Sequence, residues 1–228
     1  MVNWFRVSVL EVGYMKLSDL SQAVILGNAG LAEKLTREAL KQGIPARNIY
    51  QEALIPGMEV VGKKMQSGEY YIPEVLLSAD VMKAATEIIK PALLKAGAVR
   101  SAGKVVIGTV AGDLHDIGKN LVIIMLEGAG FEVTDIGVDN SPDKFIAAVE
   151  EINPDIVGLS ALLSVTMLNM KDVIRSLEEA GFRKRVKVMV GGAPLSPGFA
   201  EEIGADGYAR DAGGAVDLAK SLIKRGGM

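Results

Sequence analysis

The sequence has no cysteine and only one histidine among its 228 residues. The lack of cysteine excludes disulfides, thiolate metal sites, iron–sulfur clusters and a cysteine nucleophile. A lone histidine also cannot build a zinc site, which needs several protein ligands. No apolar run approaches the ~20 residues of a membrane helix, and the N-terminus lacks the pattern of a signal peptide. We therefore expect a cytoplasmic protein with no membrane partner.

The chain also has no long run of basic residues. Its formal net charge is −3, and Lys and Arg are interspersed with Asp and Glu. This distribution disfavours nucleic acid as a partner. The hydrophobic fraction of 49% is high enough to build a sizeable core.

Residues 18–96 show apolar positions at helical spacing and no strand pattern. Ser18 or Asp19 is expected to cap the first helix, and Pro56 is expected to start or kink part of the third. Helices joined by short connections predict a four-helix bundle, which we define as a helical cap domain. Residues 1–17 are expected to form an N-terminal extension.

The pattern changes after a small-residue linker at residues 97–103, and residues 104–228 are expected to form an α/β domain. Here β-branched apolar runs alternate with helical segments, which predicts a parallel sheet with helices on both faces. The expected strands are KVVIGTV at 104–110, FEVTDIG at 131–137, DIVGLSA at 155–161, VKVMVGG at 186–192 and DGYAR at 206–210. The predicted fold class is α/β: a helical bundle followed by a doubly wound, flavodoxin-like or Rossmann-like sheet of five strands.

His115 follows the first expected strand, in the stretch GTVAGDLHDIGKN. Ligands of doubly wound sheets bind at the carboxyl ends of the strands, so this histidine lies at a ligand-binding edge. A neutral imidazole is a good ligand for a transition metal, and Asp113 can accept a hydrogen bond from the second ring nitrogen. With no other histidine or cysteine, the metal would have to arrive with its other positions filled, as in a tetrapyrrole.

Other interpretations of these residues stay open at this point. His115 could be a general base, or an ordinary surface or core histidine. Asp113 and Asp116 could be helix N-caps. A flavin or nucleotide site is also conceivable, although the glycine-rich stretches at 27–30 and 128–133 do not have the form G-x-G-x-x-G.

Three motifs, in this order, resemble the signature of the cobalamin-binding family. They are D-x-H-x-x-G at 113–118, S-x-L at 160–162 and G-G at 191–192. The resemblance implies that His115 takes the lower axial position on the cobalt of cobalamin, whose own base is detached. The nucleotide tail of the cofactor would run into a slot at the sheet edge. Glycines at 118, 191 and 192 would leave room for it.

The resemblance also implies roles for individual residues. Asp113 would hold the imidazole of His115, and Thr166, where the best-known members have serine, would extend this hydrogen-bond chain; these three form the expected catalytic set. The stretch GEYYIPEVLLSADVMKAA at 68–85 is similar to the cap of methionine synthase and of small corrinoid proteins, which shields the corrin. The expected cofactor-binding residues are Asp113, His115, Asp116, Ile117, Gly118, Ser160, Leu162, Ser164, Gly191 and Gly192, with Tyr71, Val75 and Met82 from the cap.

The function implied by the resemblance is that of a methyl carrier. Cobalamin would receive a methyl group from a donor-specific methyltransferase, pass through methylcobalamin, and deliver the methyl group to a second methyltransferase acting on a pterin or a thiol. A reductive activation protein would be a further partner. The chain lacks the ~250 residues of a substrate-binding barrel, so it would not be catalytic alone. The alternatives are a cobalamin-dependent sensor and the small cobalamin-binding subunit of a mutase.

Overall fold

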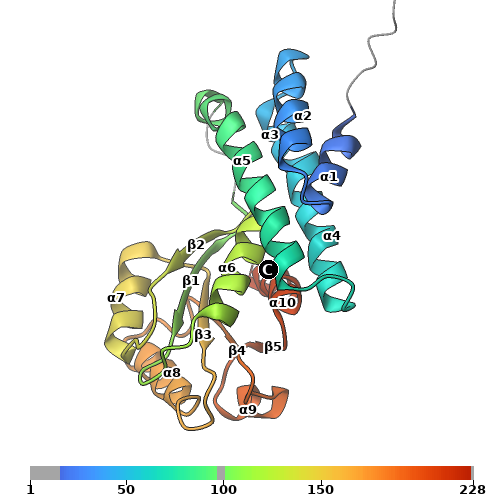
Figure 1. Cartoon of the computed structure of the whole chain (residues 1–228). Coiled ribbons are helices and arrows are strands. Elements are labelled where there is room, and N and C mark those ends of the chain that lie inside the picture. The colour runs from blue at the N-terminus through green and yellow to red at the C-terminus, as the bar shows by residue number, and fades with distance from the viewer. Residues whose placement is uncertain (1–15, 97–100, 227–228) are drawn as a thin grey trace, which may run out of the picture.

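The computed structural model describes residues 16–96 and 101–226. Its N-terminal half contains only helices (Figure 1). They are α1 (Leu17–Ile25), α2 (Ala29–Lys41), α3 (Ala46–Ile49), the π-helical segment η1 (Tyr50–Leu54), α4 (Ile55–Gln66) and α5 (Ile72–Ala96). Because α3, η1 and α4 follow one another with helical backbone at each junction, they form one continuous rod. The predicted bundle of four helical rods is therefore present.

One of two detailed predictions about these helices is wrong, and the other is met. Helix α1 begins at Leu17 with Lys16 in the N-cap position and no side-chain cap, so the assignment of Ser18 or Asp19 as the cap is wrong. Pro56 lies in the first turn of α4, where the predicted third helix continues after the π-helical segment, so the expectation that it starts or kinks this part is confirmed. Just before it, Ile55 donates its N–H to the Tyr50 carbonyl, which is the longer π-type bond.

The C-terminal half is a sheet of five parallel strands in the order β2-β1-β3-β4-β5. This is the flavodoxin-like strand order. In such sheets the ligand site lies at the carboxyl ends of β1 and β3, because the connections that follow these two strands run in opposite directions along the sheet. The strands are β1 (Lys104–Thr109), β2 (Glu132–Asp135), β3 (Ile156–Ser160), β4 (Lys187–Gly191) and β5 (Gly207–Ala209), each inside its predicted run. Thr109 is in register with Ser160, and Ser160 with Gly191. The three sequence motifs therefore meet at one edge of the sheet.

Helices cover both faces of the sheet. They are α6 (Ile117–Gly128), α7 (Pro142–Ile152), α8 (Asn169–Glu179), α9 (Pro197–Glu202) and α10 (Ala212–Gly226). One apolar core lies under α7, α8 and α9 and includes Phe145, Met170 and Leu177. The second core lies under α6 and α10 and continues without a break into the helical half.

Helix α4 packs directly on α6 and α10, as Figure 1 shows. A Cβ added to Gly128 of α6 would lie 3.1 Å from Met58 Cβ, and one on Gly213 of α10 would lie 2.9 Å from the Gly62 carbonyl oxygen. Glycine thus allows these helices to approach closely. An ion pair between Glu59 and Lys220 spans the same contact.

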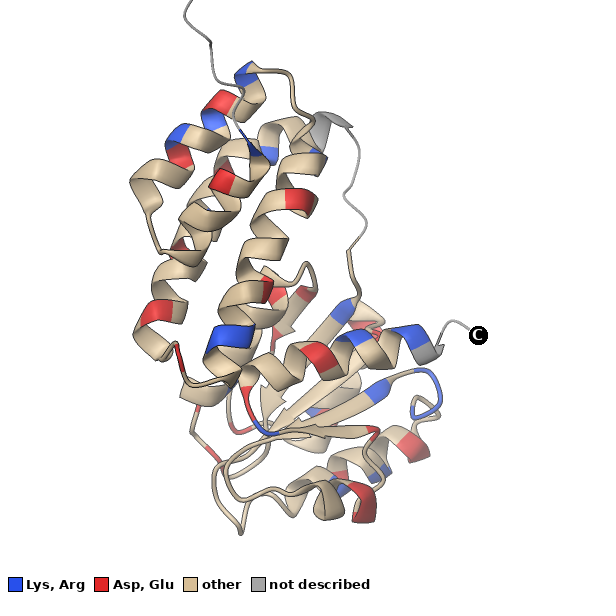
Figure 2. Ribbon diagram, turned by 90° about the vertical axis from the view of Figure 1, so that its right-hand side faces the viewer, with Lys and Arg blue, Asp and Glu red and all other residues tan. Residues whose placement is uncertain are grey.

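Charged residues of both signs are interspersed along the helices of both halves (Figure 2). Within residues 16–96 and 101–226, no helix is long and apolar enough to cross a membrane. Most of the expected N-terminal extension and of the expected linker falls outside the described residues, and Leu17, the last residue of the expected extension, is the first residue of α1. At the C-terminal end of the expected linker, Ala102 donates its N–H to the Gly130 carbonyl.

Candidate functional site

A cavity of about 580 Å³ opens at the carboxyl edge of the sheet, between α6 and α10. Its walls come from the central strands, from the first turns of these two helices and from the loops after β1, β3 and β4. The lining residues that the sequence predicts as cofactor-binding are His115, Asp116, Ile117, Gly118, Ser160, Leu162, Gly191 and Gly192. Most of the other lining side chains are apolar, among them Ile107, Leu121, Val122 and Met189.

His115 lies at this cavity in the loop between β1 and α6. Its Nδ1 is 2.7 Å from Asp113 Oδ1, and its side chain is half exposed while that of Asp113 is fully buried. An ionised carboxylate can only accept a hydrogen bond, so Nδ1 carries the ring hydrogen and donates a hydrogen bond to Asp113. This fixes the tautomer in which Nε2 has a free lone pair for a ligand.

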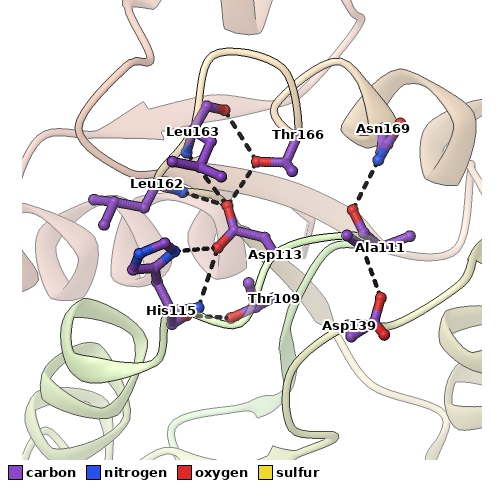
Figure 3. A network of polar contacts seen from close by, with 10 residues as sticks. Thr109, Ala111, Asp113, His115, Asp139, Leu162, Leu163, Thr166 and Asn169 are labelled. Atoms are coloured by element: carbon purple, nitrogen blue, oxygen red, sulfur yellow. Dashed lines mark hydrogen bonds and ion pairs between the residues drawn. The ribbon is translucent and has the colours of Figure 1, made fainter.

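The Asp113 carboxylate is held by several donors at once (Figure 3). Oδ2 accepts from the Thr166 hydroxyl at 2.6 Å and from the Leu162 and Leu163 N–H groups at 2.8 and 3.3 Å. Oδ1 also accepts from the His115 N–H at 3.1 Å. Burial by itself raises the pKa of Asp113, but the hydrogen bonds from Thr166, Leu162 and His115 outweigh it and hold the pKa well below its usual range. Asp113 therefore stays ionised although it is buried.

The predicted chain of His115, Asp113 and Thr166 is thus present as a continuous hydrogen-bonded series. Threonine replaces the serine of the best-known members without loss of the hydroxyl contact. Asp116 occupies the N-cap position of α6, but its side chain makes no capping bond; it accepts from Asn120 Nδ2 at 3.2 Å instead. The interpretation of Asp116 as a helix cap is therefore wrong.

Besides the buried Asp113, four of the expected cofactor residues do not line the cavity. Ser164 and Tyr71 are exposed, and the Tyr71 side chain lies on the surface of the helical half. Val75 and Met82 belong to the buried core, with exposed fractions of 0% and 6%. In this arrangement Val75 and Met82 pack in the core of the helical half, and their role in covering the cofactor stays a prediction.

The motif glycines serve different physical purposes. Gly118 lines the cavity, and a Cβ there would meet no atom within 4 Å outside its own helix and neighbours, so the space beside it is open. A Cβ on Gly192 would lie 1.8 Å from the Ala161 carbonyl oxygen, and its φ of +137° disfavours any other residue. Gly192 is therefore required by a close backbone approach, whereas the resemblance implies that it makes room for the cofactor.

Sequence reasoning missed two features of the cavity wall. Lys119 is almost fully buried, and its Nζ donates to Asp135 Oδ2 at 2.6 Å, although GKN at a helix start is typical of an exposed turn. Met65 of α4 also lines the cavity, which makes the helical half part of its wall. Leu114, Ile117 and Leu162 line the cavity together with His115 and are exposed apolar side chains. The segment after β3 carries three more, Leu163, Val165 and Leu168.

These residues fit a cobalt corrinoid. Within the described part of the chain no group of three or more His, Cys, Asp or Glu could hold a bare metal ion. The site instead offers one oriented imidazole, an apolar rim and a deep apolar cavity. Gly118 leaves a space there that a Cβ would fill. Such a set suits a metal that brings its own ring of ligands and needs one axial partner.

Comparison with known proteins agrees with this chemistry. Two family models, both described as B12 binding domain, match residues 103–217 and 17–90. A corrinoid protein of Desulfitobacterium hafniense is 41% identical over 209 residues, covering 91% of this chain and 97% of the relative. The dimethylamine corrinoid protein 1 of Methanosarcina acetivorans is 43% identical over 207 residues, covering 91% and 97%.

Solved structures give the same result. A cobalamin-binding protein from Desulfitobacterium hafniense has a TM-score of 0.78 at 32% identity, covering 91% of this chain and 98% of that one. A chain of the methanol:cobalamin methyltransferase complex of Methanosarcina barkeri has a TM-score of 0.81 at 29% identity, covering 91% and 79%. The monomethylamine corrinoid protein of the same organism has a TM-score of 0.50 at 36% identity, covering 90% and 98%. The chain belongs to the B12-binding corrinoid protein family, in which a helical B12-binding region precedes a B12-binding α/β domain.

Proposed function

We propose that this chain is the methyl-carrying corrinoid subunit of a methyltransferase system and that His115 is the lower axial ligand of its cobalamin. The observation that carries the proposal is the half-exposed imidazole at the cavity, whose Nδ1 is fixed by a buried, ionised Asp113. When bound, cobalamin supplies a cobalt centre that can accept a methyl group and give it up.

The protein's own residues orient the imidazole of His115. Asp113 accepts the hydrogen bond from Nδ1 of His115, which leaves Nε2 as the ring nitrogen available to cobalt, while Thr166 and the Leu162 N–H share the Asp113 carboxylate. These hydrogen bonds would fix the carboxylate that orients the imidazole, so that His115 would be held in one position toward the cobalt when cobalamin is bound.

The apolar surfaces would hold the rest of the cofactor and keep water away. Leu114 and Ile117 have exposed fractions of 71% and 72% beside His115, and a corrin lying on the rim would cover them. The cavity between α6 and α10 would hold the nucleotide tail, with the Ser160 hydroxyl available to hydrogen-bond it. Apolar burial on this scale would favour retention of the cofactor without any covalent attachment.

The helical half would move during the cycle. The monomethylamine corrinoid protein has a sequence identity of 36% to this chain, and the cobalamin-binding protein of D. hafniense has 32%. The TM-scores run the other way, at 0.50 and 0.78. A different placement of the two halves in that protein would lower its TM-score in this way. This supports a cap that changes its position about the linker at residues 97–103, to expose the cobalt to a partner.

The proposed partners are a donor-specific methyltransferase, an acceptor methyltransferase acting on a pterin or thiol, and a reductive activation protein. Relatives named for dimethylamine and monomethylamine, and a chain of a methanol-specific complex, share this architecture. The choice of donor therefore resides in the partner methyltransferase. A cytoplasmic location, expected from the sequence, stays a prediction.

Methylation of the loaded protein tests the methyl-carrier role. The protein is loaded with hydroxocobalamin, reduced with titanium citrate and treated with ¹³C-methyl iodide, and protein-bound ¹³C is measured after gel filtration. We expect one methyl group per bound cobalamin, released to a thiol only when an acceptor methyltransferase is added. Loaded protein that retains no methyl group would contradict the carrier role and favour a sensor.

A further inference from the structure

The loop that carries Asp113 and His115 is fastened by side chains from elsewhere in the fold. The Gly112 N–H donates to Asp139 Oδ1 at 2.7 Å, and the Asp139 N–H donates to the Asp113 carbonyl at 3.0 Å. Asp139, in the loop between β2 and α7, thus binds two successive residues of the His115 loop. Figure 3 shows it on the side of this loop opposite to Leu162 and Leu163.

Asp139 adopts an unusual backbone conformation to make these two bonds. Its φ is +52°, one of only two positive values at non-glycine residues in the described ranges 16–96 and 101–226. A left-handed conformation at a non-glycine residue costs free energy, and Asp and Asn tolerate it best. Such strained positions persist where the surrounding structure requires them, and they concentrate at functional sites.

A second fastening comes from the other side of the site. Asn169, the first residue of α8, donates from Nδ2 to the Ala111 carbonyl at 2.8 Å. Its N–H donates to the Thr166 carbonyl at 3.0 Å. Asn169 therefore ties the His115 loop to the same turn that supplies the Thr166 hydroxyl to Asp113.

These contacts complete a set that leaves the His115 loop little freedom. The Thr109 hydroxyl donates to the His115 carbonyl at 2.9 Å, and the buried Asn140 donates from Nδ2 to the Thr109 carbonyl at 2.8 Å. No bond in this set reaches the imidazole itself. Each acts on the main chain on which Asp113 and His115 are mounted, and so sets the position of the ring without changing its chemistry.

We propose that Asp139 and Asn169 are positioning residues that hold the His115 loop in the position from which the imidazole can bind cobalt. The inference rests on the proposed function, because it presupposes the axial role of His115. Loosening either contact lets the loop withdraw from the cobalt, so that the fraction of protein with bound imidazole falls while the apolar cavity still retains the cofactor.

Three variants of the first position separate its hydrogen bond from its backbone conformation. Asp139→Gly keeps the left-handed backbone and removes the acceptor for Gly112. Asp139→Asn keeps both the acceptor and tolerance of the backbone conformation. Asp143→Ala, at an exposed position in the first turn of α7, is the matched control for loss of a nearby carboxylate. Asn169→Asp independently replaces the donor to Ala111 with an acceptor of the same shape.

Two measurements are made on each variant. Amide hydrogen exchange of Gly112 in the apoprotein reports whether the loop is loosened. The EPR spectrum of the cobalamin-loaded protein, reduced to cobalt(II), reports the ratio of imidazole-bound to imidazole-free cobalt through nitrogen splitting.

We expect Asp139→Gly to speed the Gly112 exchange and to lower the bound-to-free ratio by about five- to tenfold, the effect of one lost hydrogen bond. Asn169→Asp should lower the ratio by a similar factor, whereas Asp139→Asn and Asp143→Ala should match the wild type. The same ratio in Asp139→Gly and the wild type, despite faster exchange, would overturn the inference. So would an equal loss in Asp139→Asn.

Failure of the proposed function, in which His115 is the axial ligand of bound cobalamin, would give different results. In that case the wild type would not retain cobalamin, or its spectrum would equal that of His115→Ala. If Asp139→Gly does not fold, Asn169→Asp decides the question alone: an unchanged bound-to-free ratio in this variant overturns the inference.

Discussion

Replacing Gly118 with alanine should move apoprotein stability and cofactor affinity in opposite directions. Gly118 is the second residue of α6, and a Cβ there meets no atom within 4 Å outside its own helix and neighbours. Alanine inside a helix is about 0.5–1 kcal/mol more favourable than glycine. Because Gly118 lies in the first turn, the free energy of unfolding of the apoprotein should rise by roughly 0.5 kcal/mol, the lower of these values. The new methyl group occupies the cavity, however, and cobalamin affinity should fall at least ~10-fold, or about 1.4 kcal/mol.

Urea unfolding of the apoprotein and a hydroxocobalamin titration measure the two quantities. Gly198→Ala is the matched control, because Gly198 is the second residue of α9, and its Cβ would lie no closer than 4.0 Å to another residue. It should stabilise the apoprotein similarly and leave the affinity unchanged. A Gly118→Ala protein that binds cobalamin as tightly as the wild type, or one that is less stable, would refute the reasoning.

Three further predictions concern the apoprotein and are measured by urea unfolding. Gly192→Ala should destabilise it by more than about 3 kcal/mol, since its Cβ would lie 1.8 Å from the Ala161 carbonyl oxygen; a folded protein of normal stability would contradict the close approach. Thr166→Val should cost about 1.5–3 kcal/mol by removing a donor from the buried Asp113 carboxylate, whereas Thr166→Ser should restore stability; equal losses would count against the hydroxyl. Because the folded-state pKa of Asp113 lies below its unfolded value of about 4, its contribution is complete above that pH and is lost as the pH falls toward the folded pKa. Asp113→Asn should lack this part of the acid dependence, and an identical pH profile in the variant would disprove it.

The arrangement of the sheet is predictable from the sequence because its signals are local. Short runs rich in β-branched residues mark the first four strands, a weaker run, DGYAR, marks the fifth, and the alternation with helices requires parallel pairing. Parallel pairing then places Thr109, Ser160 and Gly191 at one edge. The order and spacing of the three motifs are therefore sufficient to locate the site from the sequence alone.

The helical half could not be predicted to the same depth. Apolar residues at helical spacing look alike whether they face a bundle core or a cofactor, so the sequence alone could not show that Val75 and Met82 are buried in the core. The entry of Met65 into the cavity wall depends on how α4 packs against α6 and α10, which no local pattern encodes. Tertiary packing determines these positions.

The contacts of Asp139 and Asn169 could not be predicted from the sequence, because they too depend on tertiary structure. Each lies at a turn or helix start, where Asp and Asn are common for local reasons. Their partners, Gly112 and Ala111, are distant in sequence and are bound through main-chain atoms. A residue that binds a main chain leaves no signature in its partner's side chain.

The absorption spectrum of the cobalamin-loaded protein, compared between the wild type and His115→Ala, tests the central claim most directly. The account predicts that both proteins retain hydroxocobalamin through the cavity and that the axial-ligand bands differ, with imidazole coordination in the wild type alone. Identical spectra would contradict the role of His115 as the axial ligand, and a wild type that retains no cobalamin would contradict the assignment of the cavity.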